Sequence, residues 1–174
     1  AAMLDSGELL PNTLVADVPT NYGGYQPENF DKKYAGAISA KLVLSKSLNV
    51  PTVRMLQKFG LQKFHDYLQK LNLKDIRKNA NHYGLTLVLG GAESNLWDLC
   101  KSYASMASTV NHYTENSSRY LTNEFCEPTF YGDEKIDFGE ESSEKVIFDA
   151  ASIYLTFESL KEVNRPNAEG NWEF

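Results

Sequence analysis

Apolar residues recur at every third or fourth position over much of this chain, which is the spacing of one face of an α-helix. The spacing appears in residues 34–42, 53–59, 61–71, 96–107 and 147–155. Asp31 is the expected N-cap of the first helix, about four turns long, and Gly60 is expected to end the second. The pattern therefore predicts a mainly α-helical protein with a helical core over residues 32–110.

Two of these helices present well-defined apolar faces. The most regular face follows Ser94 and Asn95, either of which can cap a helix, and carries Leu96, Leu99, Cys100, Tyr103, Ala104 and Ala107. A cysteine on such a face usually acts as a small buried hydrophobe. A final helix over residues 142–163 is expected to start after Ser142 or Ser143 and to bury Ile147, Ala150, Ala151, Tyr154 and Leu155.

The remaining segments lack helical spacing. Residues 1–31 are rich in turn formers and are expected to run extended over a surface, although the first four resemble the end of a helix. Residues 124–139, centred on Gly132 and Asp133, are expected to form a β-hairpin. Residues 85–89 fit either a short buried strand or a buried helical turn. We interpret residues 1–174 as one partial domain that is mainly α with one small β-hairpin.

Composition narrows the classes of function. The 174 residues are 42% hydrophobic, which is enough for one core. With 17 basic and 23 acidic residues the net charge is −6, which argues against a nucleic-acid partner. No apolar run reaches the length of a membrane span. The histidines and cysteines show no metal-ligand spacing, so we expect no metal and no cofactor. The sequence leaves open whether Cys100 and Cys126 form a disulfide.

A polar corner at residues 47–49 separates two of the predicted helices. Pro51 fixes its own φ and disfavours helical geometry at Val50, so one helix is expected to end near Leu48 and the next to start near Pro51. A hydroxyl at Ser47 and a carboxamide at Asn49 can then point to one place outside the helices. A purely structural interpretation stays open, in which Asn49 caps the following helix and Ser47 is a helix-end residue.

The surroundings of this corner carry a resemblance to a known family. The relevant stretches are residues 25–31, 34–36, 47–53, 83–93, 96–99 and 163–167. Their order and spacing resemble the transpeptidase domain of class A penicillin-binding proteins, most closely those of the penicillin-binding protein 1C type. The resemblance runs from about Leu4 to Trp172.

The resemblance implies roles for two residues. Ser47 and Asn49 match the family's second active-site motif, Ser-x-Asn. Ser47 would pass a proton between the nucleophile, its lysine and the leaving amine. Asn49 would hydrogen-bond the donor peptide or the amide of a β-lactam. We therefore take Ser47 and Asn49 as the candidate catalytic residues.

Two other motifs of the family have no counterpart in the expected place. These are a Ser-x-x-Lys that supplies the nucleophile and a Lys-Thr-Gly or Lys-Ser-Gly that binds the substrate carboxylate. Residues 142–145 match Ser-x-x-Lys literally, but they follow the corner and lie in an acidic stretch, where Ser142 or Ser143 is better explained as a helix cap. We expect the missing motifs to lie beyond both ends of this chain, which alone should be inactive.

The resemblance also implies a fold and a cellular setting. The fold would be the helical part of a β-lactamase-like serine acyltransferase, without most of its central sheet. Such a piece should expose an apolar face and self-associate. The parent would be a peptidoglycan synthase that binds stem peptides and β-lactams, carries a glycosyltransferase domain elsewhere, and is anchored by a single span at the periplasmic face of the bacterial inner membrane.

Two other hypotheses remain at this stage. In the first, the chain is a non-catalytic helical module that binds peptide or protein in a groove lined by Tyr22, Tyr25 and Trp97. The second is an independent hydrolase that uses Ser47 with His82 or His112. It is weaker, because no nucleophile-elbow sequence is present.

Overall fold

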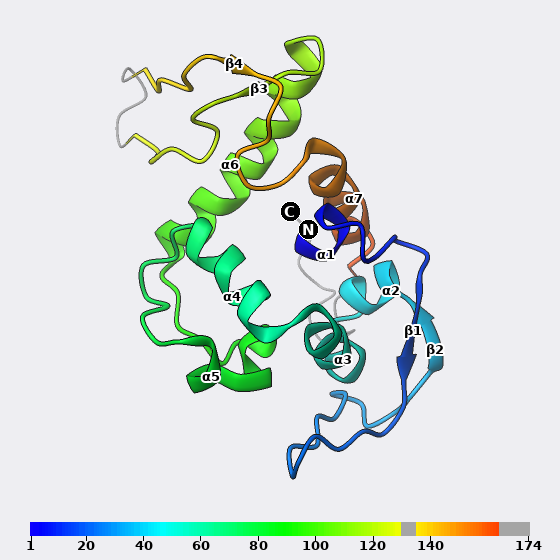
Figure 1. Ribbon diagram of the computed structural model, residues 1–174. Helices are drawn as coiled ribbons and strands as arrows, with labels where there is room; N and C mark the ends of the chain where they lie inside the picture. Colours follow the sequence, from blue (N-terminus) through cyan, green and yellow to red (C-terminus); the bar gives the residue numbers. More distant parts are fainter. Residues whose placement is uncertain (130–134, 164–174) are drawn as a thin grey trace, which may run out of the picture.

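Helices dominate the computed structural model, which describes residues 1–129 and 135–163 (Figure 1). In chain order the elements are α1 (Ala2–Asp5), β1 (Leu14–Asp17), β2 (Gly36–Ser39), α2 (Ala40–Ser45), α3 (Asn49–Phe59), α4 (Leu61–Lys70), α5 (Ala80–Tyr83), the 3-10 helix η1 (Gly84–Leu89), α6 (Leu96–Glu115), β3 (Tyr120–Leu121), β4 (Glu141–Ser142) and α7 (Ala150–Leu160). The prediction of a mainly α-helical chain with a small antiparallel hairpin is confirmed, and η1 settles the ambiguity at residues 85–89 in favour of a helical turn.

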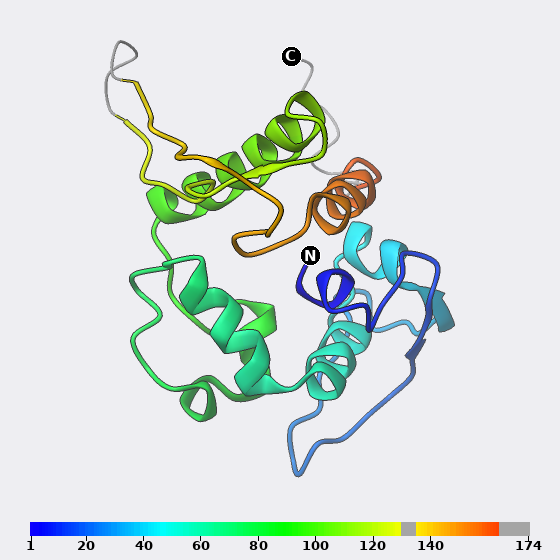
Figure 2. The ribbon, with the colours of Figure 1, turned by 45° about the horizontal axis from the view of Figure 1, so that its top comes forward.

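Helix α3 forms where the pattern predicted a helix. It begins two residues before Pro51 and ends at Gly60, whose φ of 99° is easily adopted only by glycine. Val53 and Leu56 on its apolar face are almost fully buried. α3 contacts β1 and η1, and α7 contacts both α1 and α2 (Figure 2).

The four-turn helix predicted after Asp31 is confirmed only in its last part, where residues 40–45 form α2, and is wrong before that point. Residues 36–39 form strand β2, which pairs antiparallel with β1, so that Val15 lies opposite Ile38. The Asp31 side chain accepts a hydrogen bond from Lys33 N in a local turn instead of capping a helix. Pairing with β1 buries Ile38 beside Val15 and Val43, and this tertiary contact outweighs the helical spacing.

The strands of the small hairpin lie just outside the predicted range of residues 124–139. Strand β3 pairs with β4, and Asn123 N donates to Phe138 O at 2.9 Å. The side chain of Glu124 accepts from Leu121 N, closing a turn that ends the regular pairing. The predicted strands within 124–139 are therefore replaced by pairing at residues 120–121 and 141–142, and the predicted turn at Gly132 and Asp133 lies outside the described residues.

The last helix starts later than predicted. Asp149 caps α7 by accepting from Ser152 N at 2.6 Å, whereas the hydroxyl of Ser142 accepts from Glu144 N in a turn. The predicted buried face is also partly wrong, because Tyr154 is 53% exposed while Ile153 is fully buried.

Helix α6 presents the opposite face to the one expected. Leu96 is 77% exposed, Tyr103 is 54% exposed, and Cys100 is exposed with a free thiol. The buried face instead carries Asp98, Lys101, Ser102, Ser105, Met106 and Thr109. Asn95 caps the helix, as one of the two predicted candidates.

The buried polar groups of α6 have partners. Asp98 accepts from the backbone N–H of Lys74 at 2.9 Å, a bond that holds the pKa of its carboxyl below the usual range. Lys101 Nζ lies 3.0 Å from Glu127 Oε1. Asn95 donates to both Asp75 and Asp98. Polar contacts within the chain therefore decide which face of α6 turns inward.

Candidate functional site

Ser47 lies at the end of α2 in an unusual backbone conformation. Its φ is 52°, in the left-handed region that non-glycine residues rarely adopt. Leu48 N donates to Val43 O and Ser47 N donates to Leu44 O, both at 3.1 Å, which is a Schellman ending of the helix. This ending reverses the chain at Ser47 and leaves its side chain exposed. Within residues 1–129 and 135–163, its hydroxyl makes no hydrogen bond.

Asn49 is the first residue of α3, and it does not cap the helix as the structural alternative proposed. Leu48 occupies the N-cap position and has no side-chain capping bond. The amide of Asn49 donates instead to the backbone oxygen of Glu28 at 2.9 Å. Each carboxamide carries two N–H groups and an oxygen, so a second donor and the acceptor oxygen remain for a ligand.

Packing fixes the corner between these two residues. Leu48 packs against a buried cluster of Val15, Ile38, Ala40 and Val43 from both strands and α2. The hydroxyl of Thr52 donates to Leu48 O at 2.6 Å. The corner is therefore held by the apolar contacts of Leu48 and by the hydrogen bond from Thr52 on α3.

The sequence did not reveal two buried residues behind the corner, Asp17 and Asn29. The amide of Asn29 donates to Asp17 Oδ1 at 2.8 Å and accepts from Val50 N at 3.1 Å. Asn29 lies within the polar run 25–31, which belongs to the family resemblance, so this run was a usable signal. Asp17 could be recognised only after β1 was known, because it shares the buried face of that strand with Val15.

The literal Ser-x-x-Lys at residues 142–145 does not form a nucleophile pair. Lys145 Nζ makes an ion pair with Asp5 at 2.6 Å. The Asp5 carboxylate also accepts from Tyr67, and burial together with this contact raises the pKa of Tyr67 to about 12. Lys145 therefore ties the segment between β4 and α7 to α1 and is not poised beside a serine.

Neither histidine of the hydrolase hypothesis contacts Ser47. His112 Nδ1 lies 2.9 Å from Glu124 Oε2, and the His82 ring packs edge-on against Tyr83. The residues described contain no group of three or more potential metal-ligating His, Cys, Asp or Glu residues. In the same part of the chain, no helix has both the length and the apolar character needed to cross a membrane.

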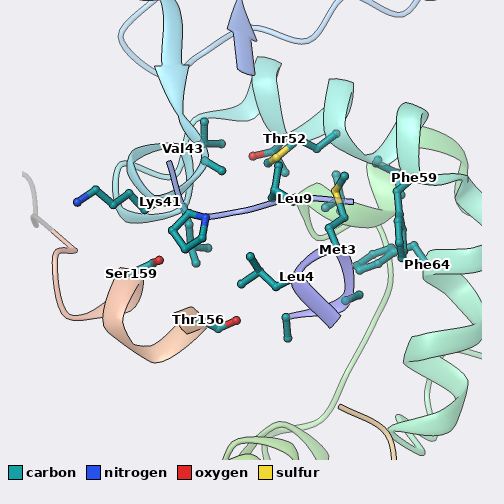
Figure 3. A pocket seen from close by; sticks show the side chains of 18 residues that line it. Met3, Leu4, Leu9, Lys41, Val43, Thr52, Phe59, Phe64, Thr156 and Ser159 are labelled. Atoms are coloured by element: carbon teal, nitrogen blue, oxygen red, sulfur yellow. The ribbon is translucent and has the colours of Figure 1, made fainter. Parts of the chain in front are cut away.

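An apolar cavity of about 270 Å³ lies between α1, α2, α3 and α7 (Figure 3), and its lining does not include Ser47 or Asn49. Met3, Leu4, Val43 and Phe59 are among the residues that line it. The hydroxyls of Thr52, Thr156 and Ser159 on its wall all donate to backbone carbonyl oxygens one turn earlier in the chain. Because its wall is mainly apolar and these three hydroxyls are already hydrogen-bonded, the cavity does not present catalytic chemistry.

Sequence comparison finds relatives that are named penicillin-binding proteins. Penicillin-binding protein 1C of Escherichia coli (strain K12) is 38% identical over 104 residues, which are 60% of this chain and 14% of that protein. Penicillin-binding protein 1F of Bacillus subtilis (strain 168) is 35% identical over 106 residues, with the same two shares. The chain thus spans a small part of the length of these relatives.

Solved structures share the fold at low sequence identity. The TP domain of penicillin-binding protein 3 from Burkholderia pseudomallei matches with a TM-score of 0.67 and 15% identity, covering 95% of this chain and 50% of that one. Penicillin-binding protein 3 from Mycobacterium tuberculosis, complexed with aztreonam, matches with a TM-score of 0.61 and 18% identity, covering 97% and 40%.

The sequence model described as the penicillin binding protein transpeptidase domain matches residues 1–114. This range contains both strands of the first sheet, the Ser47–Asn49 corner and most of α6. The neighbours in sequence and in structure carry the same family name. By its sequence and its fold, this chain belongs to the penicillin-binding protein transpeptidase family.

Proposed function

We propose that this chain is the central part of the transpeptidase domain of a peptidoglycan synthase. The observation that supports this best is the family match over residues 1–114, which includes a corner where Ser47 and Asn49 retain free polar groups. The parent would join stem peptides by D,D-transpeptidation and would be acylated by β-lactams. The alternative of a non-catalytic binding module is not favoured by relatives that are named penicillin-binding proteins.

In this proposal the reaction proceeds through an acyl-enzyme. A serine oxygen from another part of the parent attacks the carbonyl carbon of the donor peptide and passes its proton to a neighbouring lysine. Ser47 relays a proton to the departing D-alanine amine as its bond to the carbonyl breaks. The free N–H of Asn49 holds the donor amide. An acceptor amine then attacks the ester carbonyl and forms the new amide, the bond from the acyl carbon to the serine oxygen breaks, and the proton lost by the amine returns to the serine oxygen.

The setting of the parent is part of the same proposal. It would carry a glycosyltransferase domain elsewhere in its sequence and be anchored by one span, with this domain at the periplasmic face of the inner membrane. The apolar face of α6, with Leu96 77% and Tyr103 54% exposed, would make the isolated chain self-associate.

The deciding experiment measures covalent labelling by a fluorescent penicillin, through intact mass, on this chain and on the longer protein that contains it. We expect an adduct on the longer protein only. Ser47→Ala and Asn49→Ala should each slow its formation about 100-fold, since proton relay and an oriented donor each contribute on that order.

Ser118→Ala is the matched control, because Ser118 is also an exposed serine with a positive φ, of 65°. The longer protein carrying it should be labelled at the unchanged rate. An adduct on the 174-residue chain would show that a serine within it is the nucleophile, and the assignment of Ser47 would fall. No adduct on either protein would favour the binding module.

A further inference from the structure

A buried pair of polar residues lies behind the Ser47–Asn49 corner. Asp17 is 1% exposed and Asn29 is 2% exposed. The amide nitrogen of Asn29 donates to Asp17 Oδ1 and to the backbone oxygen of Lys33, each at 2.8 Å, and its oxygen accepts from Val50 N at 3.1 Å. A flipped amide would turn its NH₂ toward the Val50 N–H and its oxygen toward the carboxylate. The contacts therefore permit a single orientation.

Asp17 sets this orientation from strand β1. Its second oxygen accepts from Ala35 N at 2.8 Å, so both carboxylate oxygens face N–H donors. Among the residues described, no lysine, arginine or histidine forms an ion pair with Asp17. Burying a carboxylate without a cation is costly unless its hydrogen bonds are well made. An apolar residue at this position would leave the buried amide of Asn29 and the N–H of Ala35 without an acceptor, so the Asp17 carboxylate ties the orientation of Asn29 to strand β1.

Asn29 reaches the start of α3 across 21 residues of sequence. The first backbone N–H groups of a helix have no partner within it, and the N-cap residue Leu48 supplies none from its side chain. Asn29 fills that role for Val50. The adjacent Glu28 oxygen accepts the Asn49 side chain. Two consecutive residues, 28 and 29, thus hold the beginning of α3 and the side chain of Asn49 together.

We propose that Asp17 and Asn29 are positioning residues for the Ser47–Asn49 corner. Asp17 fixes the amide of Asn29, Asn29 fixes the first turn of α3, and this turn places Asn49 against Glu28. The inference rests on the proposed function, because the corner matters only if Asn49 meets a substrate. Neither Asp17 nor Asn29 needs to touch that substrate.

The test uses three variants of the longer protein: Asp17→Asn, Asn29→Asp and the double variant that carries both substitutions. Asp17→Asn turns an NH₂ toward either the Asn29 amide or Ala35 N, so we expect penicillin acylation to slow about tenfold. We also expect faster hydrogen exchange in the peptide covering residues 49–53, read by mass spectrometry. Asp31→Asn is the matched control in the same loop, because the amide oxygen it introduces can still accept from Lys33 N. Both readouts should stay unchanged in it.

The double variant, in which Asp17 and Asn29 trade side chains, distinguishes a positioning role from simple loss of stability. When the amide and the carboxylate trade places, the pair can restore its mutual hydrogen bond in the opposite direction and keep the acceptor for Val50 N. The contact with Lys33 O is lost, and acylation should still recover relative to both single variants. Asn29→Asp places two carboxylates against each other, which can prevent folding. In that case Asp17→Asn still tests the proposal.

The outcomes separate this inference from the proposed function. If the unmodified longer protein is acylated and Asp17→Asn is acylated at the same rate, the positioning role is wrong and the proposed function stands. Slower acylation with unchanged exchange at 49–53 also overturns positioning. If the unmodified protein is not acylated, the proposed function fails. Hydrogen exchange in residues 49–53, compared between the unmodified protein and Asp17→Asn, then decides alone whether Asp17 holds the corner.

Discussion

Helices α3 and α6 both carry clear apolar patterns, yet the chain buries the pattern of α3 and exposes the more regular pattern of α6. On α3 the apolar residues face inward, with Val53 fully buried and Leu56 3% exposed. On α6, Leu99 is 41% exposed and Asp98 is 1% exposed. Periodicity thus identifies which residues share a face. Which face turns inward depends on what the rest of the chain offers as a partner.

The partners explain the difference. α3 packs against β1 and η1, in which Val15 and Leu87 are buried hydrophobic residues. α6 meets the backbone of Lys74 and the side chains of Asp75 and Glu127, which satisfy polar groups. We propose that in the longer protein the apolar face of α6 is covered by the part of the fold that this chain does not match, since it covers only 50% of the Burkholderia pseudomallei domain.

The largest expected effect comes from Leu56→Ala on α3. It would enlarge the apolar cavity that Leu56 lines and lower the free energy of unfolding of this chain by about 3 kcal/mol. Urea unfolding followed by circular dichroism measures this. A loss below about 1 kcal/mol would mean that α3 is not packed as described.

An intermediate effect is expected at the polar end of α6. Asn95→Ala removes the cap, whose oxygen accepts from Asp98 N at 2.8 Å, and should lower the free energy of unfolding by about 1 kcal/mol. Asn95→Ser, which can still cap the helix, should recover part of the loss in the same urea titration. Equal losses in both variants would mean that the contacts of the Asn95 amide with Asp75 and Asp98 matter more than the cap.

The smallest effect is expected from Leu99→Ala, the same chemical change as Leu56→Ala but on the exposed face of α6. It should change the free energy of unfolding by less than about 0.5 kcal/mol. Analytical ultracentrifugation should show weaker self-association of this variant. A loss as large as that of Leu56→Ala, under dilute monomeric conditions, would show that the α6 face is buried within the chain.

The sequence predicted the elements whose local signals agree with their packing. α3, its end at Gly60, and the capping of α6 by Asn95 followed from such signals. The first part of the helix predicted after Asp31 was wrong because Ile38 gains more from pairing beside Val15 than from a helix. The start of α7 was missed because Asp149 was a better cap than either serine, and only the fold shows which cap is used.

The candidate site was predictable in part for similar reasons. The corner at residues 47–49 follows from Pro51 and from the family resemblance. The bond from Asn49 to Glu28 and the network of Asp17 and Asn29 span 12 to 21 residues of sequence. Contacts at that separation leave no periodic signal in a single sequence, so they required the fold.

The left-handed backbone at Ser47 has a consequence for any effort to engineer this chain. A Schellman ending favours glycine at this position, because a side chain there is strained. A library selected for cellular abundance would therefore enrich Ser47→Gly, whereas one selected for cell-wall synthesis would deplete it if the hydroxyl relays a proton. If Ser47 has that role, stability and activity pull this one residue in opposite directions, and consensus-style stabilisation should leave position 47 untouched.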